Sequence, residues 1–348
     1  MGRLYLINPT YLLRIKAMKR TLLAVTTLLL AGTSLAQTKT LTVYSGRAKT
    51  FVDPVVQQFE KQTGIKVNVR YGTDAQLVAA IREEGSKSPA DVFWGNSMGA
   101  LGELAEEGRF TKLGTALTRN VSSDYLPDNR AWVPTTVRFR TLAYNTGKIK
   151  PEQLPESILD LPKMTSLKGR IGWTVSYPSF QDFLGAMISK YGEATTRQWL
   201  EGMKALQPKD YKTSNVGMLE AMRAGEIDVA LTNHYYIQRV NRLSYPIDTY
   251  FFKNGDIGNL GNATGAAILK TTKNSASAAR FLSALVAKDA QTFFLSVNFE
   301  YPVIGNILQP TTMLPYSDVV KRSPRIDPTV LPKNIDKAQK LLRDAGLL

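Results

Sequence analysis

The stretch Thr232–Val240 reads TNHYYIQRV and holds two adjacent tyrosines, Tyr235 and Tyr236, directly after an apolar run. Neighbouring side chains of a regular strand point to opposite faces, so both rings reach one point only if the chain turns here. A phenol has a pKa of about 10 and is a poor ligand for common divalent ions, but a hard trivalent cation such as Fe³⁺ can displace its proton. The pair therefore fits a ferric site or ordinary core packing, and these residues alone leave both interpretations open.

The remaining reactive residues exclude most classes of enzyme. The chain contains one histidine, His234, and no cysteine, so Cys/His catalysis and thiolate metal sites are excluded. The sequence has no G-x-S-x-G, S-x-x-K, H-E-x-x-H, phosphate-loop or EF-hand pattern, which leaves two cleft carboxylates as the main open catalytic arrangement. We expect no enzyme, and we interpret His234 as a surface residue or a group behind the site rather than a ligand. Trp94 is expected to be exposed at the edge of a cleft.

The N-terminus has the pattern of a secretory signal peptide. Residues 18–37 begin with Met18 and a Lys-Arg pair, continue through a short apolar run, and place small residues at Ser34 and Ala36. The apolar run is shorter than the ~20 residues of a membrane span, and no cysteine follows it to carry a lipid. We expect cleavage after Ala36, so residues 1–36 are upstream sequence and leader, and the mature protein is periplasmic without stable membrane insertion.

The charge of the mature chain is basic but dispersed. The leader has five basic residues and no acid, so 39 basic and 29 acidic residues remain, a net charge of +10. Nucleic-acid binding calls for basic residues clustered with aromatics, whereas here Lys and Arg are mixed with acids along the chain. This balance argues against a nucleic-acid partner and favours a negatively charged ligand or partner surface.

Strands and helices alternate in the first third of the mature chain. Gly64 is expected to end one helix in a left-handed conformation, and Thr73 with Gln76 has capping-box spacing at the start of the next. The predicted strands cover 40–46, 65–72 and 89–95, and the predicted helices cover 51–63, 73–85 and 96–108. This order predicts a parallel sheet with helices on both faces.

Two long extended segments, 132–145 and 262–272, interrupt that alternation and enclose a second α/β set. Within that set we predict a strand near 170–175, a helix from 179, a helix over 217–226 and a strand over 227–233 that ends at the tyrosine pair. Two extended crossings between two α/β sets predict an α/β fold of two lobes joined by a strand hinge, with the ligand in the cleft. The expected parts are lobe 1 at 37–137 and 262–305, lobe 2 at 138–261, and a C-terminal helical segment at 306–348 that packs on the lobes.

Six segments in order give the chain a family resemblance. They are LTVYSGR (41–47), GIKVNVRYG (64–72), REEGSKSPADVFWG (82–95), VRFRTLAYN (137–145), LKGRIG (167–172) and GEIDVALTNHYY (225–236). From residue 40 to about 305 the chain resembles the periplasmic ferric-iron-binding proteins of iron(III) ABC transporters, within the bacterial extracellular solute-binding proteins. The resemblance implies a two-lobed monomer that binds Fe³⁺ through Tyr235 and Tyr236 and passes it to a permease with an ATPase partner.

The sequence departs from this family at two positions. Ala48 stands where many relatives have a histidine ligand, and Asn96 stands where many have an acidic one. A second group of relatives uses a third tyrosine and a bound carbonate-type anion instead, and Tyr177 falls near that tyrosine. The resemblance thus implies Tyr177 as the third ligand, although it also fits an aromatic residue that shapes the turn before Pro178.

A ferric ion with three phenolates and a carbonate-like anion is negative overall, so it needs positive partners. Arg47 follows the first strand and can offer a planar fork to the anion, with Arg138 on the crossing segment as a second candidate. Ser179 is expected to cap a helix that starts at Phe180, whose free N–H groups favour an anion. Solvated arginines and a plain helix cap are the alternatives. An organic anion or a polyamine in the same two-lobed fold remains the alternative function.

Overall fold

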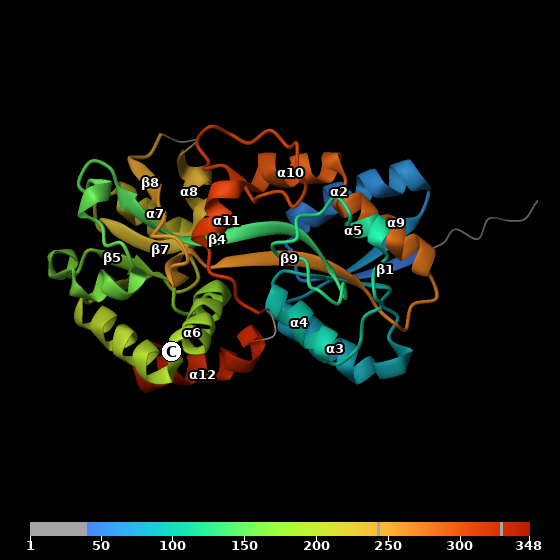
Figure 1. Cartoon of the computed structure of the whole chain (residues 1–348), viewed down its shortest axis with the longest axis horizontal. Helices are drawn as coiled ribbons and strands as arrows, with labels where there is room; N and C mark the ends of the chain where they lie inside the picture. The colour runs from blue at the N-terminus through green and yellow to red at the C-terminus, as the bar shows by residue number, and fades with distance from the viewer. Residues whose placement is uncertain (1–39, 242–243, 328–329) are drawn as a thin grey trace, which may run out of the picture. The chain divides into compact units, whose positions relative to one another are not determined.

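Two long strands, β4 (Val133–Asn145) and β9 (Gly261–Ile268), run antiparallel through the centre of one nine-stranded mixed sheet (Figure 1). The computed structural model describes residues 40–241, 244–327 and 330–348. The predicted upstream sequence and signal peptide, which together cover residues 1–36, lie outside the described residues. Both central strands fall in the two segments that the sequence predicts to be extended crossings.

The first lobe is built on three parallel strands, β1 (Thr40–Ser45), β2 (Lys66–Tyr71) and β3 (Val92–Gly95), in the order β2-β1-β3-β9. Its helices are α2 (Lys49–Thr63), α3 (Asp74–Glu84), α4 (Met98–Glu106), α5 (Thr115–Thr118), α9 (Ser275–Leu285) and α10 (Lys288–Asn298). Gly64 ends α2 with a φ of 70°, and both hydrogen bonds of the Thr73–Gln76 capping box are formed. Local sequence signals therefore set where α2 ends and where α3 begins.

The second lobe contains β5 (Ile171–Trp173), β6 (Lys209–Asp210), β7 (Val229–Asn233) and β8 (Ile247–Tyr250). Strand β5 is parallel to β6 and β7, whereas β4 is antiparallel to β7 and β8. The helices are α6 (Pro178–Ala205), α7 (Asn215–Arg223) and α8 (His234–Asn241). Helix α6 is interrupted at Gly192, where φ is 83°, because only glycine adopts that conformation readily.

Strand β4 changes partners midway along its length. Its residues from Val133 to Phe139 pair with β9, and those from Arg140 to Tyr144 pair with β7. This change of partner within one continuous strand makes β4 a hinge strand, and it brings Arg138 and Arg140 to the junction. The two-lobed fold with a strand hinge is therefore confirmed.

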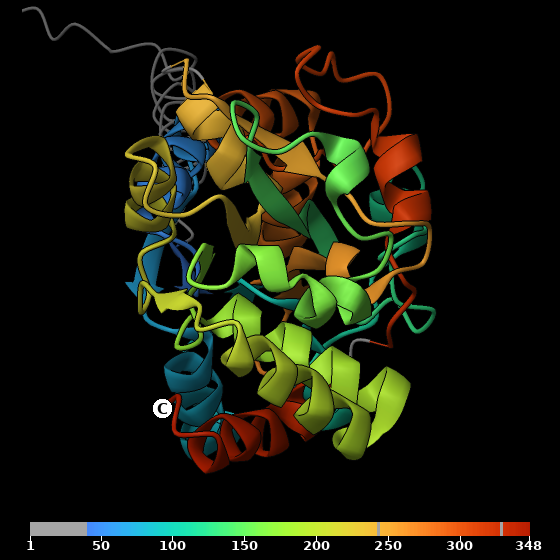
Figure 2. The ribbon, with the colours of Figure 1, turned by 90° about the vertical axis from the view of Figure 1, so that its left-hand side faces the viewer.

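The C-terminal segment contacts both lobes. Helix α11 (Tyr316–Arg322) is followed by α12 (Val330–Asp344), which packs on α6 and on α4 (Figure 2). Leu331 and Leu341 are buried in this packing, and Lys333 Nζ lies 2.6 Å from Glu106 Oε1. Short 3₁₀ turns occur at Gly85–Lys87, Pro151–Gln153, Ile158–Lys163, Thr165–Leu167 and Ile257–Asn259. Strand β4 runs through both lobes and α12 packs on helices of both, and Thr40–Leu348 form one compact unit.

Large aromatic side chains fill the interior under the central strands. Trp94, Trp132 and Trp173 are fully buried. The expectation of an exposed Trp94 is wrong, because its indole N–H donates to Thr135 Oγ1 at 3.3 Å inside lobe 1. No helix within the described part of the chain is both long enough and apolar enough to span a bilayer.

Candidate metal centre

The tyrosine pair lies where a strand gives way to a helix. Strand β7 ends at Asn233 and α8 begins at His234, so the turn that the sequence requires is present. In a helix, successive side chains are about 100° apart rather than on opposite faces. The ring centroids of Tyr235 and Tyr236 are 4.3 Å apart with 39° between the ring planes, and both residues line one cavity of about 510 Å³.

Tyr177 reaches the same cavity from a neighbouring strand end. Strand β5 runs parallel to β7, so the segment after β5 emerges beside the tyrosine pair. The hydroxyls of Tyr177 and Tyr236 are 2.9 Å apart and hydrogen-bonded, and Tyr235 Oη accepts a 3.3 Å bond from Asn233 Nδ2. All three tyrosines that the sequence analysis named are therefore gathered in one place.

Burial makes the phenols of Tyr177 and Tyr236 hard to ionise without a cation. Burial, followed by the charge of Tyr235, raises the pKa of Tyr177 to about 12. Burial also raises the pKa of Tyr236, and the adjacent Tyr235 and Tyr177 raise it further. Close phenolates repel one another, so they cannot all form unless a large positive charge enters between them. A hard trivalent ion provides that charge, whereas a weakly acidifying divalent ion does not.

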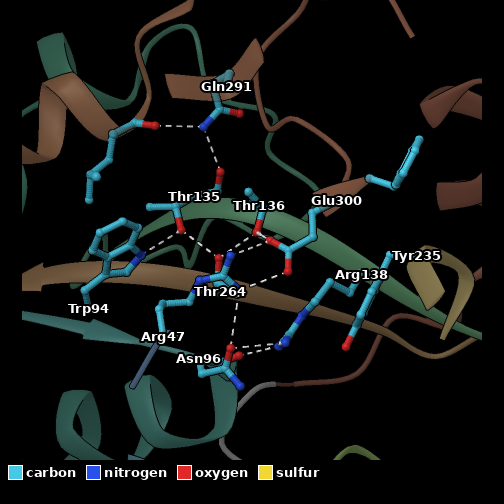
Figure 3. A network of polar contacts seen from close by, with 12 residues as sticks. Arg47, Trp94, Asn96, Thr135, Thr136, Arg138, Tyr235, Thr264, Gln291 and Glu300 are labelled. Atoms are coloured by element: carbon cyan, nitrogen blue, oxygen red, sulfur yellow. Dashed lines mark hydrogen bonds and ion pairs between the residues drawn. The ribbon is translucent and has the colours of Figure 1, made fainter. Parts of the chain in front are cut away.

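Two arginines, Arg47 and Arg138, belong to a polar network that lies beside Tyr235 (Figure 3). Asn96 Oδ1 accepts hydrogen bonds from Arg47 Nη1 at 3.3 Å and from Arg138 Nη1 at 3.2 Å. Arg138 Nη2 also donates to the Asn96 carbonyl. Asn96 thus holds two guanidinium groups side by side, and its neutral amide adds no negative charge to offset theirs.

Glu300 is a buried acidic residue of this network that the sequence analysis missed. Its carboxylate accepts two bonds from Arg47, at 3.0 and 2.7 Å, and one from Thr136 Oγ1 at 2.5 Å (Figure 3). Burial alone would raise the pKa of Glu300, but Arg47 and Arg138 outweigh burial and hold the pKa below its usual value. The planar fork predicted to face an anion is therefore engaged by Glu300. The Nε atoms of Arg47 and Arg138 are buried and have no hydrogen-bond partner among the described residues.

Ser179 lies in a second polar group next to the first. The expectation that it caps a helix starting at Phe180 is wrong, because α6 begins at Pro178 and its N-cap residue is Tyr177. Ser179 Oγ instead accepts bonds from Arg140 Nη1 at 3.4 Å and Asn233 Nδ2 at 3.2 Å.

Two charged residues beside Ser179, the buried Arg140 and the half-buried Asp182, escaped the sequence analysis. Burial lowers the pKa of Arg140 to about 10 and raises the pKa of Asp182 to about 7. Asp182 accepts a 2.9 Å hydrogen bond from Asn262, a residue of β9. No motif distinguished either residue from ordinary solvated charges, because their burial depends on how α6 packs against the two central strands.

His234 is buried, which excludes the surface alternative and agrees with a position behind the site, because its ring centroid lies 5.8 Å from that of Tyr235. Its Nδ1 accepts from the Phe139 N–H at 3.1 Å, and its Nε2–H donates to the Phe299 carbonyl at 2.8 Å. Both ring nitrogens are thus occupied by backbone groups, and neither is available to a metal. Burial lowers the pKa of His234 to about 4, despite the two backbone bonds that act in the opposite direction. The neutral ring fixes the start of α8 against the hinge strand.

Burial of the neutral His234 imidazole predicts that this one ring makes the free energy of unfolding depend on pH. The unfolded ring is charged below pH 6.5, whereas the folded ring stays neutral down to about pH 4, so the native state loses stability as the pH falls through this window. For His234→Gln, whose amide can still donate to Phe299, the stability deficit relative to wild type should be about 2 kcal/mol smaller at pH 4.5 than at pH 7. Urea unfolding of both proteins at both pH values measures this difference in the free energy of unfolding. An equal deficit at pH 4.5 and pH 7 would contradict a neutral, buried His234 with a lowered pKa.

Phenol oxygens are the candidate metal donors in this cavity. Among residues 40–241, 244–327 and 330–348, no group of three or more His, Cys, Asp or Glu side chains is arranged to hold a metal ion. A larger cavity, of about 790 Å³, lies between α4 and residues 320–327, and none of the three tyrosines lines it. The tyrosine cavity combines three phenols with the guanidinium groups of the buried Arg47 and the half-buried Arg138, a set suited to a hard cation together with an anion.

Known proteins share this architecture. Residues 44–292 match the family model described as bacterial extracellular solute-binding protein. The chain is 31% identical to the major ferric iron-binding protein of Neisseria meningitidis over 315 residues, 88% of this chain and 93% of that protein. It is also 31% identical to the Fe(3+)-binding periplasmic protein of Serratia marcescens over 313 residues, 88% of this chain and 90% of that protein.

Solved structures agree with these matches. The iron-bound HitA of Pseudomonas aeruginosa superposes with a TM-score of 0.78 at 33% identity, over 89% of this chain and all of that one. The Trichodesmium protein IdiA (FutA), solved with iron and citrate ligands, superposes with a TM-score of 0.75 at 26% identity, over 89% of this chain and all of that one.

Proposed function

The chain belongs to the bacterial extracellular solute-binding protein family, and we propose that it captures Fe³⁺ in the periplasm for delivery to an ABC-transporter permease with its ATPase. One observation carries the proposal: Tyr177, Tyr235 and Tyr236 line a single cavity, and two of their hydroxyls are 2.9 Å apart. The similarity to ferric-iron-binding proteins of Neisseria and Serratia supports the same cargo. The protein binds and releases its ligand and catalyses no reaction.

In this proposal the three phenols lose their protons as the ion enters. Each departing proton is replaced by a bond from phenolate oxygen to Fe³⁺, and three phenolates neutralise the ion's charge. The N-terminus of α6 lies at Tyr177 and presents the positive end of a helix dipole, which stabilises a phenolate there. Arg138 acts in the same direction on the pKa of Tyr177.

A synergistic anion, carbonate in our proposal, occupies the positive side of the cavity. Arg138 borders both the tyrosine cavity and the small polar group around Ser179, so it is the residue placed to join the two. Arg47 contributes a buried Nε–H that has no partner among the described residues, while Glu300 fixes its orientation. Arg47, Arg138 and Ser179 are the proposed anion-binding residues.

We further propose that iron binding closes the two lobes about β4. The proposed division keeps lobe 1 at 37–137 and 262–305, lobe 2 at 138–261 and the C-terminal helical segment at 306–348. The partner change in β4 between Phe139 and Arg140 supports this division. The tyrosines lie in lobe 2 and Arg47 lies in lobe 1, so a bound ion with its anion connects the lobes within one monomer.

The direct test adds ferric citrate and bicarbonate to the purified protein. Phenolate-to-iron charge transfer should give an orange to red colour with one iron per chain. Calorimetry with citrate alone tests the alternative of an organic-anion carrier. A colourless protein that binds citrate without iron would replace the ferric proposal.

Removing one hydroxyl tests the third ligand. Tyr177→Phe should weaken ferric binding by at least about 100-fold, because even residues that only support metal ligands cost 10- to 100-fold when replaced. Competition with a chelator of known affinity measures the change. Tyr144→Phe is the matched control, since Tyr144 is buried on β4 and is absent from the residues that line the cavity. Equal affinities for both variants would remove Tyr177 from the ligand set.

A further inference from the structure

Arg239 lies one helical turn after the tyrosine pair and covers both rings. Its guanidinium carbon is 5.1 Å from the ring centroid of Tyr235 and 5.4 Å from that of Tyr236, within the range of cation–π attraction. These contacts follow from the i,i+3 and i,i+4 spacing on α8. Arg239 is half-buried in the wall of the tyrosine cavity.

The same guanidinium group touches the opposite lobe. Its carbon lies 5.7 Å from the ring centroid of Phe51, which belongs to α2. Helix α2 packs on β2 and α9 in lobe 1, whereas α8 packs on β4, β7 and β8 in lobe 2. Arg239 therefore sits between the ring of Phe51 and the two tyrosine rings, and it bridges the cleft directly at the proposed metal ligands.

Arg239 differs from Arg47 and Arg138 in how its guanidinium group is held. Glu300 binds Arg47 with two hydrogen bonds, and Asn96 accepts two from Arg138. Arg239 has no hydrogen bond or ion pair with any residue that the structure describes; its contacts are with aromatic rings. A guanidinium over neutral phenol rings is held by weak attraction, and the attraction becomes much stronger when those rings carry phenolate charge.

We propose that Arg239 and Phe51 form a clamp across the cleft that holds the iron-loaded protein closed. The clamp rests on the proposed function, since its gain in strength comes from ionisation of Tyr235 and Tyr236 around Fe³⁺. Arg239 is a positioning residue, which binds no metal and acts through the two rings beneath it. Phe51 is the lobe 1 half of the clamp and couples closure of the lobes to that charge.

The release rate of iron tests the clamp. Arg239→Gln should release Fe³⁺ to excess EDTA about 10-fold faster than wild type, and Phe51→Leu should also release it faster, by about 3-fold. The effect of Phe51→Leu should be smaller in the Arg239→Gln background than in wild type, because the Arg239–Phe51 contact is already lost there. Any effect that remains in the double variant belongs to the contact of Phe51 with Arg47, whose guanidinium carbon also lies 5.7 Å from the ring centroid. Arg239→Lys keeps the charge but loses the flat stacking surface, so its rate should fall between those of wild type and Arg239→Gln.

The charge-transfer band separates the electrostatic role from simple packing. Removal of a cation beside the phenolates raises the energy of their donor orbitals and so lowers the energy of the phenolate-to-iron transition. The charge-transfer band of Arg239→Gln should therefore move to longer wavelength than that of wild type. The band of Phe51→Leu should stay at the wild-type position. Unchanged release rates and an unchanged band in a folded, iron-loaded Arg239→Gln would overturn the clamp while leaving the ferric proposal intact. A wild-type protein that forms no coloured iron complex would overturn both.

Discussion

The double variant Tyr235→Phe/Tyr236→Phe is expected to bind no measurable ferric ion. Two of the three proposed ligand oxygens disappear, and a single remaining phenol at Tyr177 cannot neutralise a trivalent ion. Since loss of a supporting residue alone costs 10- to 100-fold in metal affinity, loss of two ligands should cost more than about 10⁴-fold. Both aromatic rings remain, so packing on Arg239 is preserved.

The same variant should stay folded, which makes the loss of binding informative. The hydroxyls removed have one hydrogen bond each, from Asn233 to Tyr235 and between Tyr177 and Tyr236. Such bonds contribute about 1 kcal/mol each, so the free energy of unfolding should fall by about 2 kcal/mol at most. Absorbance titration with ferric citrate and bicarbonate, paired with urea unfolding, measures both quantities. A coloured one-to-one iron complex in this variant would show that the metal lies elsewhere.

Replacing Glu300 by Leu should have the largest effect on stability among the site substitutions. The side chains of Arg47 and Glu300 are 3% and 2% exposed, so water cannot solvate the guanidinium group that is left behind. That group would also lie beside Arg138, joined to it through Asn96. Breaking a buried pair by removing one partner costs about 3–5 kcal/mol.

A second substitution distinguishes an unpaired charge from lost packing. Arg47→Met/Glu300→Leu removes both charges and should recover most of the stability lost in Glu300→Leu, because apolar replacements of a buried pair are often neutral. The folded pKa of Glu300 is depressed, so its contribution is present above the unfolded pKa and disappears as the pH falls through the folded one. The difference between wild type and Glu300→Leu in urea unfolding should therefore shrink in acid. A double variant no more stable than Glu300→Leu would contradict this account.

Local sequence patterns determined most of the elements and their order. The period-2 strand of β2, the left-handed Gly64 and the Thr73–Gln76 capping box act over a few residues, so they are readable without knowledge of distant contacts. The alternation of these elements, interrupted by two extended crossings, predicted two α/β lobes with a strand hinge. The apolar pattern of residues 277–295 predicts one continuous helix, whereas the structure has two, α9 and α10, because that pattern continues across the break between them.

The sequence also identified the three tyrosines, but by two different routes. The turn after β7 was predictable from the pattern, and only that turn lets Tyr235 and Tyr236 reach one cavity. The role of Tyr177 came from the family resemblance, since nothing in its own neighbourhood indicates a ligand. Its 2.9 Å hydrogen bond to Tyr236 depends on the parallel pairing of β5 with β7.

Only the tertiary structure decided what surrounds these phenols. Glu300 is 253 residues away from Arg47 along the chain, and the two meet because β4 and β9 bring α10 and the end of β1 together. Burial of Trp94 and His234, and the contact of Arg239 with Phe51, also join segments from different elements. Charge pairing and desolvation act between groups that are close in space, whatever their separation in sequence. For that reason the proposed ligand residues could be predicted from the chain, whereas their burial and their charged partners depend on the packed lobes.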